Sequence, residues 1–274
     1  MFVRPIAASP RARFVATAIV TLTGLLIGSS RAAAGTVDLQ FDQTTGTSAV
    51  SIKYTIGGTT TTESAVPGPY YWHQVGSPLN SSFPNSVTTF CVELNQYIST
   101  GNQYTYTSTA LASQSGVTAL EATDITKLWG AYYNASAWDT TSFTGSLQST
   151  AFQLALWKLV YDGGTNLNLT SGNFVIPGAT ASSLNNTSTA DGLAQSWLNA
   201  LAGTPSSIFA TNFSGEQLVW LSNSWSQDQL TMIPSPTPPT VVPAPSGLVL
   251  AGIGFLGLVG RSVRRRKVAA PTAA

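Results

Sequence analysis

Alternating apolar and polar side chains predict half-buried strands in the middle part of this chain. The pattern predicts strands over residues 36–41, 49–56, 87–98 and 217–221. The first two runs have the period of two that places every second side chain on one face of a sheet, and Gly57 and Gly58 end the second run. Residues 87–98 are rich in β-branched and aromatic side chains. Residues 228–232 are interpreted as a polar continuation of the last strand, and residues 68–73 as a Pro/Gly loop with an aromatic cluster.

A helical period appears between these strands. The apolar spacing predicts helices over residues 118–133, 145–161 and 188–201. The middle helix begins at Gly145-Ser146 and stops at Asp162, where two glycines follow. Because strands come first and helices are inserted later, we expect one α+β domain over residues 35–232. It is mainly β, sandwich-like or barrel-like, with an inserted helical subdomain. A Pro-rich extended spacer over residues 233–245 follows.

Two apolar runs flank this domain. Three arginines precede the uncharged run 14–27, which ends in small residues, so residues 1–34 are predicted to be a signal peptide cut after Ala33 or Ala34. A permanent N-terminal anchor is the alternative. The second run, residues 246–260, is followed at once by basic residues and is predicted to be a transmembrane helix rather than a core helix of a soluble domain.

Charge is distributed unevenly along the chain. Nine of the twelve Lys and Arg residues lie in the two end segments, whereas all eleven acidic residues lie between them. With Lys53, Lys127 and Lys158 as its only cations, the middle section carries a net charge of about minus eight. This argues against nucleic acid or anionic lipid as its partner. Its abundant Thr, Ser, Asn and Gly suit a secreted wall or matrix protein.

Residues 243–267, near the C-terminal end of the sequence, have a recognisable order of features. Pro243 and Pro245 bracket Ala244, an apolar Gly-rich run follows, and a basic cluster closes it. The arginines of that cluster include Arg264, Arg265 and Arg266. Residues 243–267 resemble the PEP-CTERM sorting signal of Gram-negative bacteria, although Ala244 stands where that family usually has Glu. The resemblance implies recognition by an exosortase-like membrane protease, an intermediate anchored in the inner membrane, and final placement on the cell surface or in the extracellular matrix.

Two residues of the middle section suggest chemistry. Cys91 is the only cysteine, so in an oxidising compartment it has no intramolecular disulfide partner. Gln153 lies in the middle of a helix that is apolar nearly all round, where a buried amide is costly unless its hydrogen bonds are met. Attack of a thiol on a carboxamide with loss of ammonia would give an internal thioester, an activated acyl group that an amine or hydroxyl can capture.

The sequences around both residues resemble the thioester domains of bacterial surface adhesins. Phe90-Cys91 matches the aromatic-Cys strand motif, and residues 152–157 match the Thr-Gln-x-Ala-Ile-Trp helix motif, with Phe152 in place of Thr and Leu156 in place of Ile. The resemblance implies that Cys91 is the thiol and Gln153 the acyl donor, that Phe90 and Trp157 shield the bond, and that the partner is an extracellular polysaccharide or surface protein.

Other interpretations remain open. Cys91 could be merely structural and packed beneath a capped Gln153, in a matrix or biofilm protein without covalent chemistry. Glu93 and Asp162 could be the paired carboxylates of a secreted polysaccharide hydrolase, but Glu93 lies close to Cys91 and Asp162 lies in a helix-ending turn. His73, the single histidine, has no second His or Cys with which to bind a metal. We therefore expect a non-enzymatic protein with no cofactor and no metal.

Overall fold

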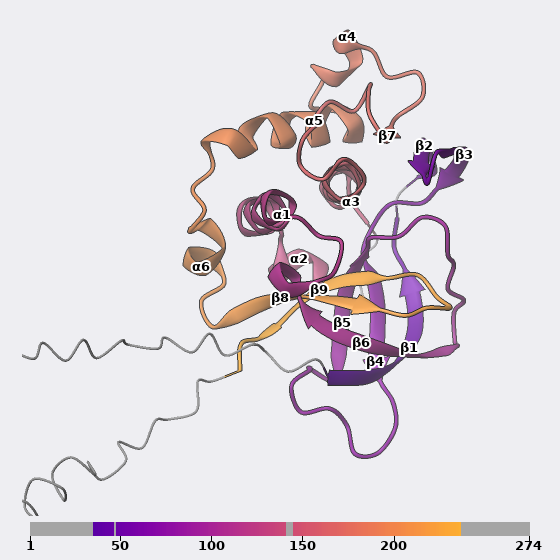
Figure 1. The fold of residues 1–274 in the computed structure, drawn as a ribbon, viewed down its shortest axis with the longest axis vertical. Helices are drawn as coiled ribbons and strands as arrows, with labels where there is room; N and C mark the ends of the chain where they lie inside the picture. Colours follow the sequence, from indigo (N-terminus) through magenta and orange to yellow (C-terminus); the bar gives the residue numbers. More distant parts are fainter. Residues whose placement is uncertain (1–34, 47, 141–144, 237–274) are drawn as a thin grey trace, which may run out of the picture. The chain divides into compact units, whose positions relative to one another are not determined.

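The computed structural model describes residues 35–46, 48–140 and 145–236, and a closed six-stranded barrel forms its β part (Figure 1). Neighbouring strands in the barrel are antiparallel. Their order round the barrel is β1 (Gly35–Thr44), β4 (Tyr70–Gln74), β5 (Ser86–Cys91), β9 (Gln229–Pro234), β8 (Glu216–Ser222) and β6 (Gln103–Ala110). The last strand of the domain therefore lies between β5 and β8.

Alternation along β1 explains how the barrel is filled. Val37, Leu39 and Phe41 are buried, whereas Thr36 and Asp38 face solvent. The apolar side chains that share this interior come from all six barrel strands and from the β4–β5 connection. They are Val37, Leu39, Phe41, Trp72, Phe83, Val87, Tyr106, Val219, Leu221 and Ile233.

A second, smaller sheet lies beside the barrel. It has the order β3 (Thr59–Ala65), β2 (Val50–Ile56), β7 (Phe174–Val175). Gly57 and Gly58 form the tight turn between β2 and β3 with φ of 56° and 83°, a backbone region that favours glycine.

All six α-helices of the described residues lie between β6 and β8 in the sequence, on one side of the barrel (Figure 1). They are α1 (Ala119–Tyr132), α2 (Ala135–Trp138), α3 (Leu147–Asp162), α4 (Ala181–Leu184), α5 (Ala190–Ala200) and α6 (Ile208–Asn212). Two short 3₁₀ turns, η1 (Leu111–Ser113) and η2 (Leu201–Gly203), accompany them. The larger hydrophobic core forms where the helices meet β2, β5, β8 and β9.

Helix α3 has well-defined ends. Ser146 is its N-cap, and the Ser146 and Ser149 side chains bond each other's main-chain N–H groups. Gly163 ends the helix in the left-handed conformation, with φ of 59°. These caps fix the register of the helix that carries Gln153.

The predicted α+β class is confirmed, and the larger of the two sheets is a closed barrel. The helices predicted over residues 118–133, 145–161 and 188–201 correspond to α1, α3 and α5. Strand β1 and strand β2 are also where alternation predicts them.

Three predictions about strands were wrong. Residues 68–73 are not a loop, because Tyr70–Gln74 form β4 between β1 and β5. The strand predicted over residues 87–98 ends at Cys91, where Val92 N–H binds the Asp228 carbonyl and the chain leaves the sheet. Residues 229–232 of the polar stretch belong to a separate strand, β9, which extends through Ile233 to Pro234.

The predicted membrane segments lie outside the described residues. Within residues 35–236, the helices that the structure describes are all too short or too polar to cross a membrane. The predicted signal peptide over residues 1–34 and the predicted helix over residues 246–260 are not part of that range.

Candidate functional site

Cys91 is the last residue of β5 and lies where one side of the strand loses its partner. It pairs with Gln229 of β9 on one side. On the other side the β4 ladder ends at the Tyr70–Thr89 pair, two residues before Cys91. The main-chain N–H and carbonyl of Cys91 therefore remain available to a side chain from α3.

That side chain is Gln153. Cys91 N–H donates to Gln153 Oε1 at 3.1 Å, and Gln153 Nε2 donates to the Cys91 carbonyl at 2.7 Å. Both residues are fully buried, with 0% of their surface exposed. The two bonds satisfy an amide that would otherwise be costly in an apolar helix. The carboxamide predicted to be the acyl donor thus lies directly against the residue that carries the thiol.

The thiol itself is held in its neutral form. Burial raises the pKa of Cys91 well above its ordinary value, and the nearby Glu93 and Asp228 carboxylates add to that increase. The Sγ–H group donates to the Glu93 carbonyl at 2.8 Å. A neutral, hydrogen-bonded thiol of this kind does not react with reagents in solution while the site stays closed.

Trp157 brings an indole N–H to the thiol. Its side chain is 1% exposed, and its interaction with the thiol opposes the rise in the Cys91 pKa. Among the described residues, however, Nε1 has no partner in good hydrogen-bond geometry. The contact with sulfur is therefore a close approach rather than a formed bond, and a buried donor remains beside Cys91.

A second residue of α3 ties this helix to the chain after β5. The Tyr161 hydroxyl accepts a hydrogen bond from Leu94 N–H at 2.8 Å. Gln153, Trp157 and Tyr161 are spaced by four residues and so lie near one face of the helix. This repeat is visible in the sequence, but sequence analysis did not assign Tyr161 to the site.

Glu93 connects the site to the β8–β9 connection. The Glu93 carbonyl accepts hydrogen bonds from the Cys91 thiol and, at 2.9 Å, from Gln227 Nε2. The Glu93 carboxylate accepts a hydrogen bond from Asp228 N–H at 3.2 Å. Neither Gln227 nor Asp228 carries a motif that would identify it in the sequence. They reach Cys91 only because β9 pairs with the end of β5.

A pocket of about 300 Å³ adjoins the buried pair. Glu93, Val92, Tyr161, Trp220 and Asp228 contribute to its wall. Burial raises the pKa of both the Glu93 and the Asp228 carboxyl groups. Residues on either side of the buried pair thus line a solvent-accessible hollow, although Cys91 and Gln153 do not line it themselves.

Phe90 faces an aromatic cluster contributed by the helices. Its ring centroid lies 4.7 Å from that of Phe152 and between 5.7 and 6.1 Å from those of Trp129, Tyr133 and Trp138. These ring contacts pack the end of β5 against the helices. Shielding of the thiol by Phe90 remains a prediction.

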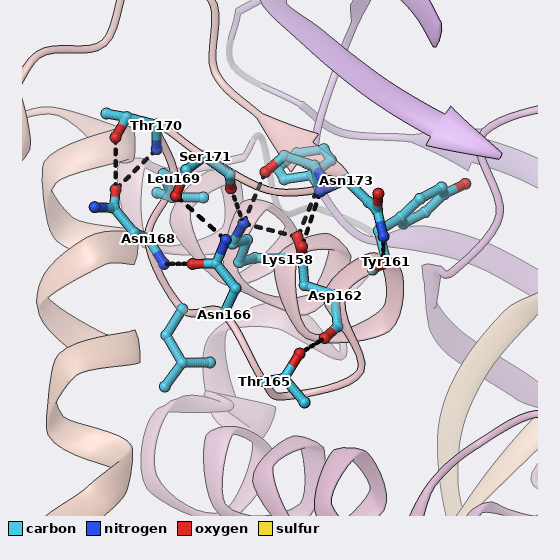
Figure 2. A network of polar contacts seen from close by, with 12 residues as sticks. Lys158, Tyr161, Asp162, Thr165, Asn166, Asn168, Leu169, Thr170, Ser171 and Asn173 are labelled. Atoms are coloured by element: carbon cyan, nitrogen blue, oxygen red, sulfur yellow. Dashed lines mark hydrogen bonds and ion pairs between the residues drawn. The ribbon is translucent and has the colours of Figure 1, made fainter. Parts of the chain in front are cut away.

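The C-terminal end of α3 is anchored by a buried ion pair (Figure 2). Lys158 Nζ, fully buried, donates to Asp162 Oδ2 at 2.7 Å and to the Ser171 and Phe174 carbonyls. Asp162 in turn accepts the N–H groups of Asn173 and Phe174. This network binds the loop after α3 and strand β7 to the helix that carries Gln153.

The remaining predicted residues lie elsewhere. His73 is on strand β4 and not in a loop, and its Nδ1 lies 2.7 Å from Asp42 Oδ1. The side-chain carboxylates of Glu93 and Asp162 both accept hydrogen bonds from main-chain N–H groups. The described ranges hold no cluster of His, Cys, Asp and Glu suited to a metal ion. Pro243, Pro245, Arg264, Arg265 and Arg266 fall outside those ranges.

A second glutamine provides an internal comparison. Gln195 on α5 is also buried; its Oε1 accepts Leu169 N–H at 2.9 Å, and its Nε2 donates to the Leu167 carbonyl at 2.9 Å. Two main-chain bonds to a buried amide are therefore not unique to Gln153. What distinguishes Gln153 is that the residue it binds carries a thiol.

No protein-family model, curated protein or solved structure matches the chain. Proposals about its function therefore rest on the geometry of the site and on the sequence resemblances.

Proposed function

We propose that this chain is an exported surface protein whose domain forms an internal thioester between Cys91 and Gln153 and uses it for covalent attachment. The partner would be an amine or hydroxyl of a surface protein or extracellular polysaccharide. The observation that carries the proposal is the double hydrogen bond between the Gln153 amide and the Cys91 main chain.

This contact orients the amide for attack. The Cys91 N–H points at Gln153 Oε1, the atom on which negative charge develops when sulfur adds to the carbonyl carbon. The unpartnered indole N–H of Trp157 is a second donor close to the sulfur. Donors arranged before the reaction stabilise such an intermediate without further rearrangement.

The proposed step is balanced without any added reagent. The Cys91 sulfur forms a bond to Gln153 Cδ, the Cδ–Nε2 bond breaks, and the thiol proton leaves with Nε2 as ammonia. The Cys91 N–H can continue to bind the acyl oxygen after the reaction. In the later step a partner's amine or hydroxyl takes the acyl group, and the thiol is restored.

Burial would protect the bond from hydrolysis. Both residues are 0% exposed, and Trp157 is 1% exposed. A nucleophile would reach the bond through the adjoining pocket, which has Glu93 and Asp228 in its wall. Access then requires a local movement of the segment after β5, which Tyr161 and Gln227 hold through hydrogen bonds.

We further propose that residues 243–267 sort the protein to the surface through an exosortase-like protease. The Pro-bracketed box and basic cluster of the sequence support this. Replacing Arg264, Arg265 and Arg266 together with Ala in the full chain should change where the protein accumulates in the producing cell. Unchanged surface placement would contradict this part of the proposal.

Intact mass tests the thioester directly. The purified protein should be lighter by one ammonia than its sequence predicts, whereas a Cys91→Ala variant should have its full expected mass. Treatment with methylamine should add one amine to the protein and expose one thiol to alkylation. An unmodified mass, with Cys91 alkylated once the protein is unfolded, would contradict the thioester.

A structural matrix protein without covalent chemistry is the second candidate. The Gln195 arrangement favours it, because there the same pair of main-chain bonds serves packing alone. This candidate predicts full mass and no reaction with methylamine. A polysaccharide hydrolase is less favoured, because Glu93 and Asp162 each bind neighbouring main-chain N–H groups; it predicts turnover that Glu93→Gln abolishes.

A further inference from the structure

Trp225 is the most exposed large hydrophobic side chain among the described residues. It is 91% exposed and lies in the connection between β8 and β9, residues 223–228. Single exposed hydrophobic side chains are common on protein surfaces, so the case for a ligand rests on how the Trp225 turn is held and on the surface beside it.

The connection presents Trp225 on a fixed turn. Asn223 Oδ1 accepts the N–H groups of Trp225 at 2.7 Å and of Ser226 at 3.1 Å. Asn223 Nδ2 donates to the Thr105 carbonyl on β6, and Asn223 N–H donates to Asp228 Oδ1. With its backbone held at several points, the turn loses little entropy when the indole binds a ligand.

A polar sheet face extends from this turn. On β1 and β6 the exposed side chains pair across the strands as Thr36 with Thr107, Asp38 with Thr105, and Gln40 with Gln103. Thr107 also pairs with Ser222 of β8. Hydroxyl and amide groups thus line the outside of the barrel beside Trp225.

A shallow hollow of about 470 Å³ joins the indole to this face. It is lined by Gln103, Tyr104, Thr105, Thr107, Ser222, Asn223, Ser224 and Trp225, all of them uncharged. Two carboxylates lie next to residues of this lining: Asp38 accepts the Thr105 hydroxyl, and Asp228 accepts the Asn223 N–H. Of the lysines in the described part of the chain, none lines the hollow.

The chemistry of this surface selects its ligand. An indole offers a flat apolar face for the C–H side of a sugar ring, and hydroxyls and amides match sugar hydroxyls in both donor and acceptor roles. A surface without cations, on a domain with three lysines and eleven carboxylates, does not favour nucleic acid or acidic polysaccharide. We propose that the Trp225 turn and the adjoining β1–β6 face bind a neutral polysaccharide.

This binding is reversible and separate from the proposed thioester. It is therefore tested in the full chain carrying Cys91→Ala, so that no covalent product forms. Electrophoresis through native gels containing a neutral β-glucan, a neutral α-glucan or a galactomannan is compared with gels containing alginate or no polysaccharide. At least one neutral polysaccharide should retard the protein, and alginate should not.

Matched substitutions locate the site. Trp225→Ala should weaken the retardation at least about tenfold, the scale of losing a central aromatic contact. Tyr97→Ala removes another aromatic side chain, 71% exposed, and should leave the retardation unchanged. Because Trp225 packs little in the fold, its variant should keep the parent's thermal unfolding midpoint.

Three results would overturn the proposal. The first is no retardation by any neutral polysaccharide, and the second is equal retardation with and without Trp225. The third is concentration-dependent dimerisation that Trp225→Ala abolishes, which would assign the indole to contact with a second copy of the chain.

Discussion

The side-chain amide of Gln153 binds the main chain of Cys91 as a neighbouring strand would, accepting its N–H at 3.1 Å and donating to its carbonyl at 2.7 Å. It does so where the β4 ladder has ended. One helix residue therefore completes the hydrogen bonding of β5 and also places a carboxamide beside the only thiol of the chain. Structural and chemical roles for Gln153 share the same contact, so the experiments must separate them.

Gln153→Glu separates these roles. The second carboxylate oxygen would face the Cys91 carbonyl where Nε2 now donates, so the variant must bury a charge or take up a proton. We expect a loss of about 3 kcal/mol or more in the free energy of unfolding at pH 7. Burial raises the folded pKa of the new carboxyl group, so this loss should shrink as the pH falls toward its ordinary value of about 4.3.

Gln195→Glu is the matched control, because Gln195 also binds main-chain groups on both sides of its amide. Urea denaturation should show a substantial loss for both variants. Only Gln153→Glu should abolish the ammonia deficit in the intact mass. Finding the deficit in both variants would remove Gln153 from the proposed bond.

Trp157→Phe tests the unpaired indole N–H beside the thiol. The substitution keeps an aromatic ring but removes the donor beside the sulfur, so we expect thioester formation to slow by about tenfold, less than the roughly hundredfold or more that losing a donor to the oxyanion itself costs. The measurement is the fraction of molecules with the ammonia deficit as a function of time after refolding.

Trp129→Phe controls for packing in this experiment. Among the described residues Trp129 Nε1 is likewise buried and unpartnered, but its ring lies in the aromatic cluster around Phe90. Its variant should change stability by a similar amount and leave the rate of bond formation unaltered. Equal rates in the two variants would show that the Trp157 N–H takes no part.

Lys158→Met should be strongly destabilising. It leaves the Asp162 side chain, 5% exposed, without its cation, and breaking such a buried pair from one side costs about 3 to 5 kcal/mol. Lys127→Met breaks the longer pair with Asp124, at 3.3 Å between side chains 14% and 8% exposed, and should cost less than Lys158→Met. Urea denaturation compares the two, and equal losses would contradict the importance of the α3 anchor.

Glu121→Gln should change how stability depends on pH. Burial raises the pKa of Glu121 from 4.5 to about 7, while its hydrogen bond from Thr118 N–H acts in the opposite direction. Below pH 4.5 the Glu121 carboxyl is protonated in both the folded and the unfolded state, so its burial does not lower the free energy of unfolding there. Stability is then lost as the pH rises from 4.5 to 7, by roughly 3 kcal/mol in total.

The glutamine variant lacks this titration. Free energies of unfolding measured at pH 5 and pH 8 should therefore differ less for Glu121→Gln than for the unmodified protein. Parallel changes in the two proteins would show that the Glu121 pKa is not raised in the folded state.

The sequence predicts the capped helices and the first two strands well, because their local signals agree with their final environment. Ser146 and Gly163 bound α3, and alternation marks β1 and β2. Strand β4 was missed because Tyr70–Gln74 is preceded by Pro67, Gly68 and Pro69, which are typical of a loop. Its strand conformation comes from pairing with β1 and β5, which no local pattern reveals.

The site was predictable only in part. Cys91 and Gln153 stand out in the sequence because a lone thiol and a buried amide are chemically unusual, and the Gln153 amide binds the Cys91 main chain in the structure. The carbonyl of Glu93 that accepts the thiol, and Gln227 and Asp228 that hold this segment, could not be predicted. Their positions depend on where β5 ends and on which strand pairs with it.

The placement of β9 has a consequence for folding. Residues 229–234 pair with both β5 and β8, so the barrel cannot close until this last strand has emerged. Until then β5 keeps an open edge, which invites pairing with another chain, and Val92 lacks its bond to Asp228. During synthesis, arrival of β9 is thus the step that closes the barrel beside the thiol and covers the open edge of β5.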